Sequence, residues 1–178
     1  MATFRRKVGG KKAYRNGRDL EKKLEILGDY LQQQVPIKAE VIRNFDNLVK
    51  ARGRGGLSSF TGGVSSCDFS FFLSNKANGF QCGMIEAKNR VKKSISKSAV
   101  SEHQTAQLER LHSLGQGAFV LCGLIDETQH YFLVQIDKWL SGPKKSHNIK
   151  DLQDMGCEMT CIQLQGELVP DVLGKLSS

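Results

Sequence analysis

SCDFSFFLSNKANGFQCGMIEAK, from Ser66 to Lys88, contains two apolar runs joined by a polar turn. The run at 69–73 is too short for an independent helix and is rich in aromatic residues, which favours a buried β-strand. Asn78-Gly79 is a strong turn signal because both residues tolerate positive φ. We therefore predict a β-hairpin whose second strand returns antiparallel over residues 80–88.

The predicted hairpin gathers charged side chains at one end of a sheet. Residues two apart in a strand share a face, so Glu86 and Lys88 point the same way while Ala87 points into the packing. A turn centred near Ala77 would place Asp68 opposite Glu86. Two carboxylates and one ammonium group would then converge.

Such a group of side chains suits metal-assisted hydrolysis of a phosphodiester. Carboxylate oxygens can hold Mg²⁺ while the ion keeps several waters, and the ion can polarise a phosphoryl oxygen and activate a water. Lys88 can orient that water or offset developing charge. An exposed hairpin with an ordinary Glu-x-Lys pair has the same pattern, so the motif alone leaves both interpretations open.

Composition indicates one globular domain with a polyanionic partner. Of the 178 residues, 39% are hydrophobic and 25% are charged, which argues against disorder. The net charge of +8 favours nucleic acid or an anionic membrane surface as the partner. No apolar run reaches the length of a membrane span and no signal peptide opens the chain, so we expect a cytoplasmic protein without membrane association. Five cysteines, without a second pair at zinc-finger spacing, predict free thiols.

Three basic segments predict contacts with phosphate. Residues 1–15 read as a flexible basic arm, residues 49–65 as a protruding glycine-rich loop, and residues 89–98 as a basic flank of the hairpin. A solubilising tail and a surface loop without a partner are the alternatives. The residues expected to contact nucleic acid are Arg5, Arg6, Lys7, Lys11, Lys12, Arg15, Arg18, Lys50, Arg52, Arg54, Arg90, Lys92, Lys93 and Lys97.

Two amphipathic helices carry further candidate site residues. Leucines at 20, 24, 27 and 31 predict a helix over residues 17–34, with Glu21 at the edge of the apolar stripe. Glu21 can lean over a sheet end or be a solvated helix residue. Ser101 and Gln104 predict a capping box that opens a second helix. Gln104 can close that cap or, with Gln107, point at the end of the hairpin strand.

The remaining pattern predicts short elements around the hairpin. We expect strands at 37–45, 118–125, 130–134 and 157–164, with the middle two forming an antiparallel pair. Trp139 is expected in the core, within a short helical turn, and residues 146–155 are expected to form a brief helix. The histidines have no partner at ligand or nucleophile spacing, which makes them structural or surface residues.

Several motifs in order along residues 14–160 carry a family resemblance. They are NGRDLE at 16–21, VPIKAEVI at 35–42, SSCDF at 65–69, IEAK at 85–88, SEHQ at 101–104 and KKS at 144–146. With them the chain resembles the RecU-type Holliday junction resolvases of Gram-positive bacteria and their phages, within the PD-(D/E)xK nuclease superfamily.

This resemblance implies a fold, an activity and a set of roles. The fold would be an α/β, restriction-endonuclease-like core over residues 16–165, a mixed β-sheet flanked by helices, followed by a tail at 166–178. The activity would be Mg²⁺-dependent incision of four-way DNA junctions by a homodimer, with Mn²⁺ able to substitute. Residues 49–65 would form the family's stalk. The implied roles are metal binding by Asp68, Glu86 and the Ala87 carbonyl, water orientation by Lys88, completion of the acidic site by Glu21 and assistance by Gln104.

Three functions remain open from the sequence. The first is a structure-selective endonuclease that resolves recombination junctions. The second is a restriction-like or repair nuclease that acts on duplex DNA. The third is a non-catalytic DNA-binding module, which leaves the clustered acids unexplained because carboxylates repel phosphate unless a cation bridges them.

Overall fold

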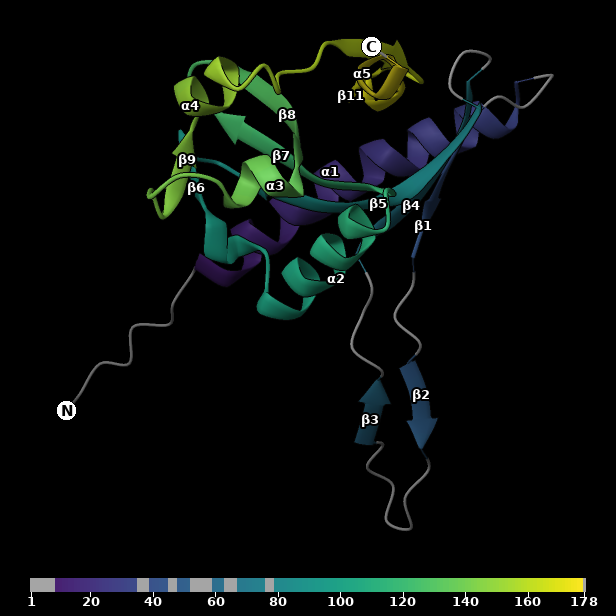
Figure 1. Cartoon of the computed structure of the whole chain (residues 1–178), viewed down its shortest axis with the longest axis horizontal. Helices are drawn as coiled ribbons and strands as arrows, with labels where there is room; N and C mark the ends of the chain where they lie inside the picture. The colour runs from purple at the N-terminus through teal and green to yellow at the C-terminus, as the bar shows by residue number, and fades with distance from the viewer. Residues whose placement is uncertain are drawn as a thin grey trace.

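The computed structural model describes residues 9–34, 39–44, 48–51, 59–62, 67–75 and 79–177, arranged as a mixed sheet flanked by helices (Figure 1). Five strands follow the order β1-β4-β5-β7-β8, with β5 and β7 parallel and the other neighbours antiparallel. This confirms the predicted mixed α/β architecture. The elements are α1 (Gly9–Gln32), β1 (Ala39–Arg43), β2 (Leu48–Ala51), β3 (Ser59–Gly62), β4 (Phe69–Asn75), β5 (Gly79–Arg90), β6 (Ser94–Ser96), η1 (Lys97–Ala99), α2 (Glu102–Ser113), β7 (Gly117–Ile125), β8 (Gln129–Gln135), α3 (Ile136–Leu140), β9 (Ser146–Asn148), α4 (Ile149–Asp154), β10 (Cys161–Leu164), β11 (Glu167–Pro170) and α5 (Val172–Ser177).

The hairpin of β4 and β5 has the predicted alignment. Phe69 pairs with Ile85 at one end of the ladder, and Asn75 pairs with Gly79 at the other. Continuing this register by one residue sets Asp68 opposite Glu86. The apolar and aromatic run of β4 therefore fixes which carboxylates can meet, because a slip of one residue would turn its buried side chains to the other face.

Helix α1 covers one face of the sheet. The predicted leucine stripe is buried, and it packs against Phe69, Phe71 and Ile85 in one hydrophobic core. Each fully buried leucine contributes about 1.5–3 kcal/mol. At Gly28 a Cβ atom would lie 2.4 Å from the carbonyl oxygen of Val41. Glycine is thus needed where the helix approaches β1 closely.

A second core lies on the opposite face, under α2 and α3. Leu108 of α2 and Trp139 of α3 are fully buried there, together with Ile95 and Val120. Helix α2 connects β5 to β7, which is the crossover that parallel neighbours require. The capping box predicted at Ser101 is confirmed, and so is the antiparallel pair, observed as β7 and β8.

The N-terminal boundary of the first helix was predicted wrongly. Helix α1 begins at Gly9 instead of residue 17, so residues 9–15 of the expected flexible arm are helical, and residues 1–8 lie outside the described part. Lysine, alanine and arginine favour a helix, and their propensities outweigh the penalty of about 1 kcal/mol for Gly17. The expected loop at 49–65 contains β2 and β3, which pair antiparallel and project as a ribbon in Figure 1.

The C-terminal boundary was also predicted wrongly. The expected tail at 166–178 contains β11 and α5, and Val169 and Val172 are fully buried in the core beneath α1. Strand β10, the paired part of the strand predicted at 157–164, joins β11 in a separate two-stranded sheet. Both elements are too short to show periodicity, and burial against α1 stabilises them instead.

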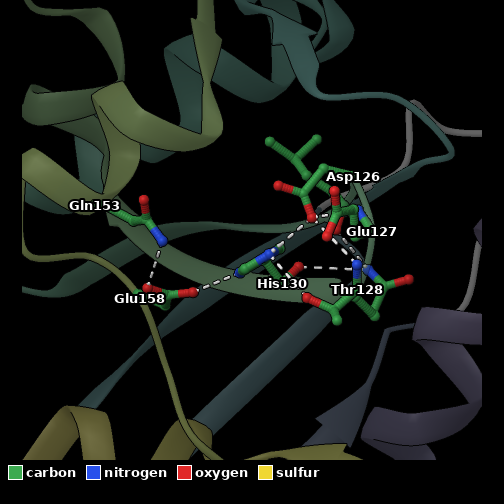
Figure 2. Close-up of polar contacts among 8 residues, drawn as sticks. Asp126, Glu127, Thr128, His130, Gln153 and Glu158 are labelled. Carbon is green, nitrogen blue, oxygen red and sulfur yellow. Dashed lines mark hydrogen bonds and ion pairs between the residues drawn. The ribbon is translucent and has the colours of Figure 1, made fainter.

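Polar residues around His130 form a hydrogen-bonded cluster at the turn of the β7–β8 hairpin (Figure 2). The ring of His130 contacts Asp126 Oδ1 at 3.1 Å and Glu158 Oε1 at 2.7 Å. Gln153 donates to the other oxygen of Glu158 at 3.0 Å. The bond with Glu158 and the bond with Asp126 together raise the pKa of His130. The cluster is structural, because it ties the hairpin to the segment that follows α4.

Candidate active site

The β4–β5 register brings the two predicted carboxylates together. The backbone N–H of Ala87 donates to Asp68 Oδ2 at 2.9 Å. Asp68 directly precedes Phe69, whose pairing with Ile85 is the last of the β4–β5 ladder. Glu86 faces the α2 side of the sheet and is fully buried, while Asp68 is half-buried. Burial, and then the charge of Asp68, raise the pKa of Glu86. This alignment is the one that the hairpin pattern predicts.

The carboxylate of Glu86 is held by one oxygen only. Its Oε1 forms an ion pair with Lys88 Nζ and accepts a 2.8 Å hydrogen bond from Gln104 Nε2. Its Oε2 is buried and has no hydrogen-bond partner within the described residues. Burial, and then the negative charge of Asp68, raise the pKa of Glu86 to about 7, although Lys88 opposes both effects.

These residues fit a hard divalent cation. A buried carboxylate oxygen without a partner carries an unsatisfied desolvation penalty, and a cation between Glu86 and Asp68 would remove it. The N–H and C=O of one strand residue point to the same side, so the Ala87 carbonyl lies on the side of Asp68. Two carboxylates and a carbonyl, with waters, form a donor set typical of Mg²⁺. In the described part of the chain, no three His, Cys, Asp or Glu side chains form a metal-binding group.

The structure places Glu21 in an ion pair with Arg43 of β1. Its Oε2 accepts a 2.5 Å contact from Arg43 Nη2, and the other terminal nitrogen of Arg43 pairs with Glu25. The bond to Glu25, and then the charges of Glu21, Glu25 and Asp68, raise the pKa of Arg43. Arg43 thus pairs with two acids of α1, and the charge of Asp68 also acts on it.

Sequence reasoning missed the role of Arg43 in this arrangement. A signal was available, because Arg43 follows Ala39 and Val41 at alternate positions of β1, and those two side chains are buried against α1. A cation at the third core-facing position predicts an acidic partner on the covering helix.

Gln104 performs both of the roles that the sequence left as alternatives. Its Oε1 accepts from the backbone N–H of Ser101 at 3.1 Å and completes the capping box, while its Nε2 reaches Glu86. Gln107 does not reach the carboxylate, and instead donates to the sulfur of Met84 at 3.4 Å.

The predicted nucleic-acid contacts fall into four groups. Arg90, Lys92 and Lys93 are exposed at and beyond the end of β5. The Lys97 ammonium is engaged instead by the carbonyls of Leu140, Ser141 and Gly142, at 3.0, 2.5 and 3.2 Å. The backbones of Lys11, Lys12, Arg15, Arg18 and Lys50 lie in α1 and β2, whereas Arg5, Arg6, Lys7, Arg52 and Arg54 lie outside the described residues.

The predicted free thiols are confirmed for all five cysteines. Cys67, next to Asp68, is fully buried, and this burial raises its pKa to about 12. The thiol is therefore protonated and inert at neutral pH. No helix within the described ranges is long and apolar enough to cross a membrane.

Comparisons with known proteins give a distant structural likeness. No protein-family model matches the chain, and no curated protein matches its sequence. Its structure is similar to a 1.6 Å resolution structure of Hjc, a Holliday junction resolvase from the archaeal hyperthermophile Archaeoglobus fulgidus. The two chains are 16% identical, the match covers 80% of this chain and 88% of that chain, and the TM-score is 0.40. A likeness at this TM-score assigns the chain neither a family nor an activity.

Proposed function

We propose that this protein is a Mg²⁺-dependent endonuclease that cuts DNA and prefers four-way junctions, as the RecU-type resemblance of its motifs implies. One observation carries the proposal. Two carboxylates meet at the hairpin, and a buried oxygen of Glu86 has no partner among the described residues. A structural ion pair with Lys88 alone gives no reason to bury that second oxygen.

Each side chain has a definite part in this chemistry. Asp68, Glu86 and the Ala87 carbonyl hold the cation. When bound, the cation polarises the scissile phosphate and activates a water. Lys88, on the same strand face as Glu86, orients the attacking water and offsets charge on the phosphate. Gln104 fixes the orientation of the Glu86 carboxylate, and Glu21 supports the acidic site through Arg43.

The junction preference has a physical basis in symmetry and charge. A four-way junction has near two-fold symmetry, and a two-fold homodimer would set one active site on each of two strands. Net charge of +8 favours binding to its phosphates. The β2–β3 ribbon is proposed as the stalk that enters the junction, and a bacterial or phage-infected cytoplasm is the proposed location.

The test is cleavage of an end-labelled four-way junction in Mg²⁺ and in Mn²⁺, beside a linear duplex of the same sequence. Wild-type protein is expected to nick the junction symmetrically and faster than the duplex. Asp68→Asn and Glu86→Ala are expected to abolish cleavage while junction binding stays nearly intact. Glu109→Gln removes one exposed carboxylate of α2 and serves as the matched control.

Three results would each contradict part of the proposal. Undiminished cutting by Glu86→Ala would remove Glu86 from the chemistry. Equal rates on junction and duplex would favour a nuclease of linear DNA. Absence of nicking by wild-type protein with either metal, while DNA still binds, would favour a non-catalytic DNA-binding module.

A further inference from the structure

The short ribbon of β6 and β9 presents one polar, uncharged face. The two strands pair antiparallel, with Ser94 opposite Asn148 and Ser96 opposite Ser146. These four side chains are exposed, whereas the intervening Ile95 and His147 are buried. We call the group Ser94, Ser96, Ser146 and Asn148 the ribbon face. It presents the hydroxyl groups of Ser94 and Ser146 and the amide nitrogen of Asn148 on one side of a β-ribbon, while the Ser96 hydroxyl bonds Lys145 O and Asn148 Oδ1 caps α4.

Contacts on the inner side hold this ribbon in place. His147 Nε2 lies 2.7 Å from the carbonyl oxygen of Trp139, and the two rings are 5.2 Å apart. Lys97, directly after β6, donates to the carbonyls of Leu140, Ser141 and Gly142 at the C-terminal end of α3. The backbone N–H of Lys97 also donates to Lys145 O at 3.0 Å. The ribbon face is thus preorganised, which lowers the entropy lost when a ligand binds.

Positive charge without a partner surrounds the ribbon face. One depression, of about 550 Å³, is lined by Arg90 and Lys92, and no acidic residue lines it. A second depression, of about 610 Å³, is lined by lysines 93, 144 and 145. Both depressions include Ser94 and Ser146. Asp151, the acidic residue that lines the second depression, is paired with Lys144 at 2.6 Å. Within the described part of the chain, no ion pair is formed by Arg90, Lys92, Lys93 or Lys145.

This basic surface is continuous with the candidate active site. Glu86, Lys88 and Arg90 occupy alternate positions of β5, so they share one face. Their partners on β7 are Val120, Cys122 and Leu124, which all belong to the core under α2. Two strand residues span about 7 Å. Arg90 therefore lies about 7 Å beyond Lys88, about two base-pair rises along DNA.

We propose that the ribbon face, with Arg90, Lys92, Lys93 and Lys145, binds the phosphodiester backbone of the DNA strand that leaves the active site. This proposal rests on the proposed function. Hydroxyl and amide groups donate to phosphate oxygens, and the basic side chains supply charge. Contacts of this kind fix the register of the strand and carry no sequence information.

The charge component is tested by binding of a fluorescent four-way junction in EDTA, where cleavage is blocked. Fluorescence anisotropy is measured for wild type, Arg90→Gln/Lys92→Gln and Arg110→Gln/Lys138→Gln at several salt concentrations. The control pair removes the same charge from exposed positions at the opposite end of the sheet. The first variant is expected to bind about 10-fold more weakly than the control, with a salt slope less steep by about 2.

The hydroxyl component has a different signature. Ser94→Ala/Ser146→Ala is expected to weaken binding by about 5-fold, because two hydrogen bonds are lost. Its salt slope is expected to match wild type, because hydroxyl groups release no counterions. Circular dichroism and the thermal midpoint verify that each variant is folded.

The outcomes separate this proposal from the proposed function. If wild type binds the junction but Arg90→Gln/Lys92→Gln matches the control pair, the basic surface is not the exit path and the inference is wrong. If Ser94→Ala/Ser146→Ala binds like wild type, the ribbon face makes no phosphate contact. If wild type binds no DNA, the proposed function itself fails.

Discussion

Gln104 donates from Nε2 to Glu86 Oε1 at 2.8 Å, and its own Oε1 accepts from the backbone N–H of Ser101 at 3.1 Å. One side chain therefore closes the N-terminus of α2 and fixes the buried carboxylate. Helix α2 is thereby held in register with β5, the strand that carries Glu86 and Lys88.

Two substitutions separate these roles of Gln104. Gln104→Glu keeps an oxygen for the capping box but loses the donor to Glu86 and adds a like charge, so junction cleavage should fall at least about 10-fold. Ser101→Ala removes the cap, should cost about 1 kcal/mol of unfolding free energy, and should leave cleavage nearly unchanged. Cleavage rates and urea unfolding measure the two effects. Equal cleavage by Gln104→Glu and wild type would show that the contact with Glu86 is dispensable.

Metal-free protein should lose stability as pH rises through the titration of Glu86. Burial and Asp68 raise the folded pKa to about 7, from an ordinary value of 4.5. The folded state then binds more protons than the unfolded state between these values, so stability falls over that window. Urea midpoints in EDTA at about pH 5 and about pH 8 should differ more for wild type than for Glu86→Gln. Mg²⁺ at the higher pH should restore stability to wild type only. A Glu86→Gln profile that parallels wild type would exclude Glu86 as the source.

The hairpin and its register could be predicted because the information is local. Alternation along the strands, with a turn centred near Ala77, predicts Asp68 opposite Glu86, and the pairing of Asn75 with Gly79 agrees with that centre. The predicted Asn78 turn position itself lies outside the described residues. The capping box at Ser101 is likewise a pattern of four residues. Both features depend on contacts within a few positions, and both were predicted correctly.

Features that depend on distant contacts could not be predicted from these patterns. Arg43 contacts Glu21 across 22 positions, and Lys97 contacts the carbonyl of Leu140, at the end of α3, across 43. Lys97 was therefore grouped with the DNA-binding residues, because sequence does not show which ammonium groups are engaged. Strand β11 and α5 were missed because burial of Val169 under α1, rather than local propensity, stabilises them.

Lys97 should contribute more to the free energy of unfolding than the exposed Lys92 does. Lys97→Met removes the ammonium that bonds Leu140, Ser141 and Gly142, and should cost about 1–2 kcal/mol of unfolding free energy. Lys92→Met, which loses the same charge without such contacts, should change stability by less than about 0.5 kcal/mol. Equal urea midpoints for the two variants would show that the carbonyl contacts contribute nothing.

The His130 cluster in Figure 2 should give a second pH dependence of the same sign as that of Glu86, over a higher pH window. Glu158 and Asp126 raise the folded pKa of His130 above its ordinary value of 6.5. The stabilisation is then fully present below about pH 6.5 and is lost as pH rises through the folded pKa. Solvent screening limits it to about 1 kcal/mol. His130→Gln should remove this dependence and His103→Gln, at an exposed position of α2, should retain it; a loss in both would contradict the assignment.

Binding of Mn²⁺ to the protein without DNA is the most direct measurement of whether Asp68 and Glu86 share a cation. Titration followed by electron paramagnetic resonance would compare wild type, Asp68→Asn, Glu86→Gln and the control Glu109→Gln. We expect wild type and Glu109→Gln to bind Mn²⁺ with the same affinity. Asp68→Asn and Glu86→Gln should each lose more affinity than the loss of about 10- to 100-fold that follows when a residue contacting only a metal ligand is removed. Unchanged Mn²⁺ affinity in Asp68→Asn and Glu86→Gln would contradict the metal site and the nuclease built on it.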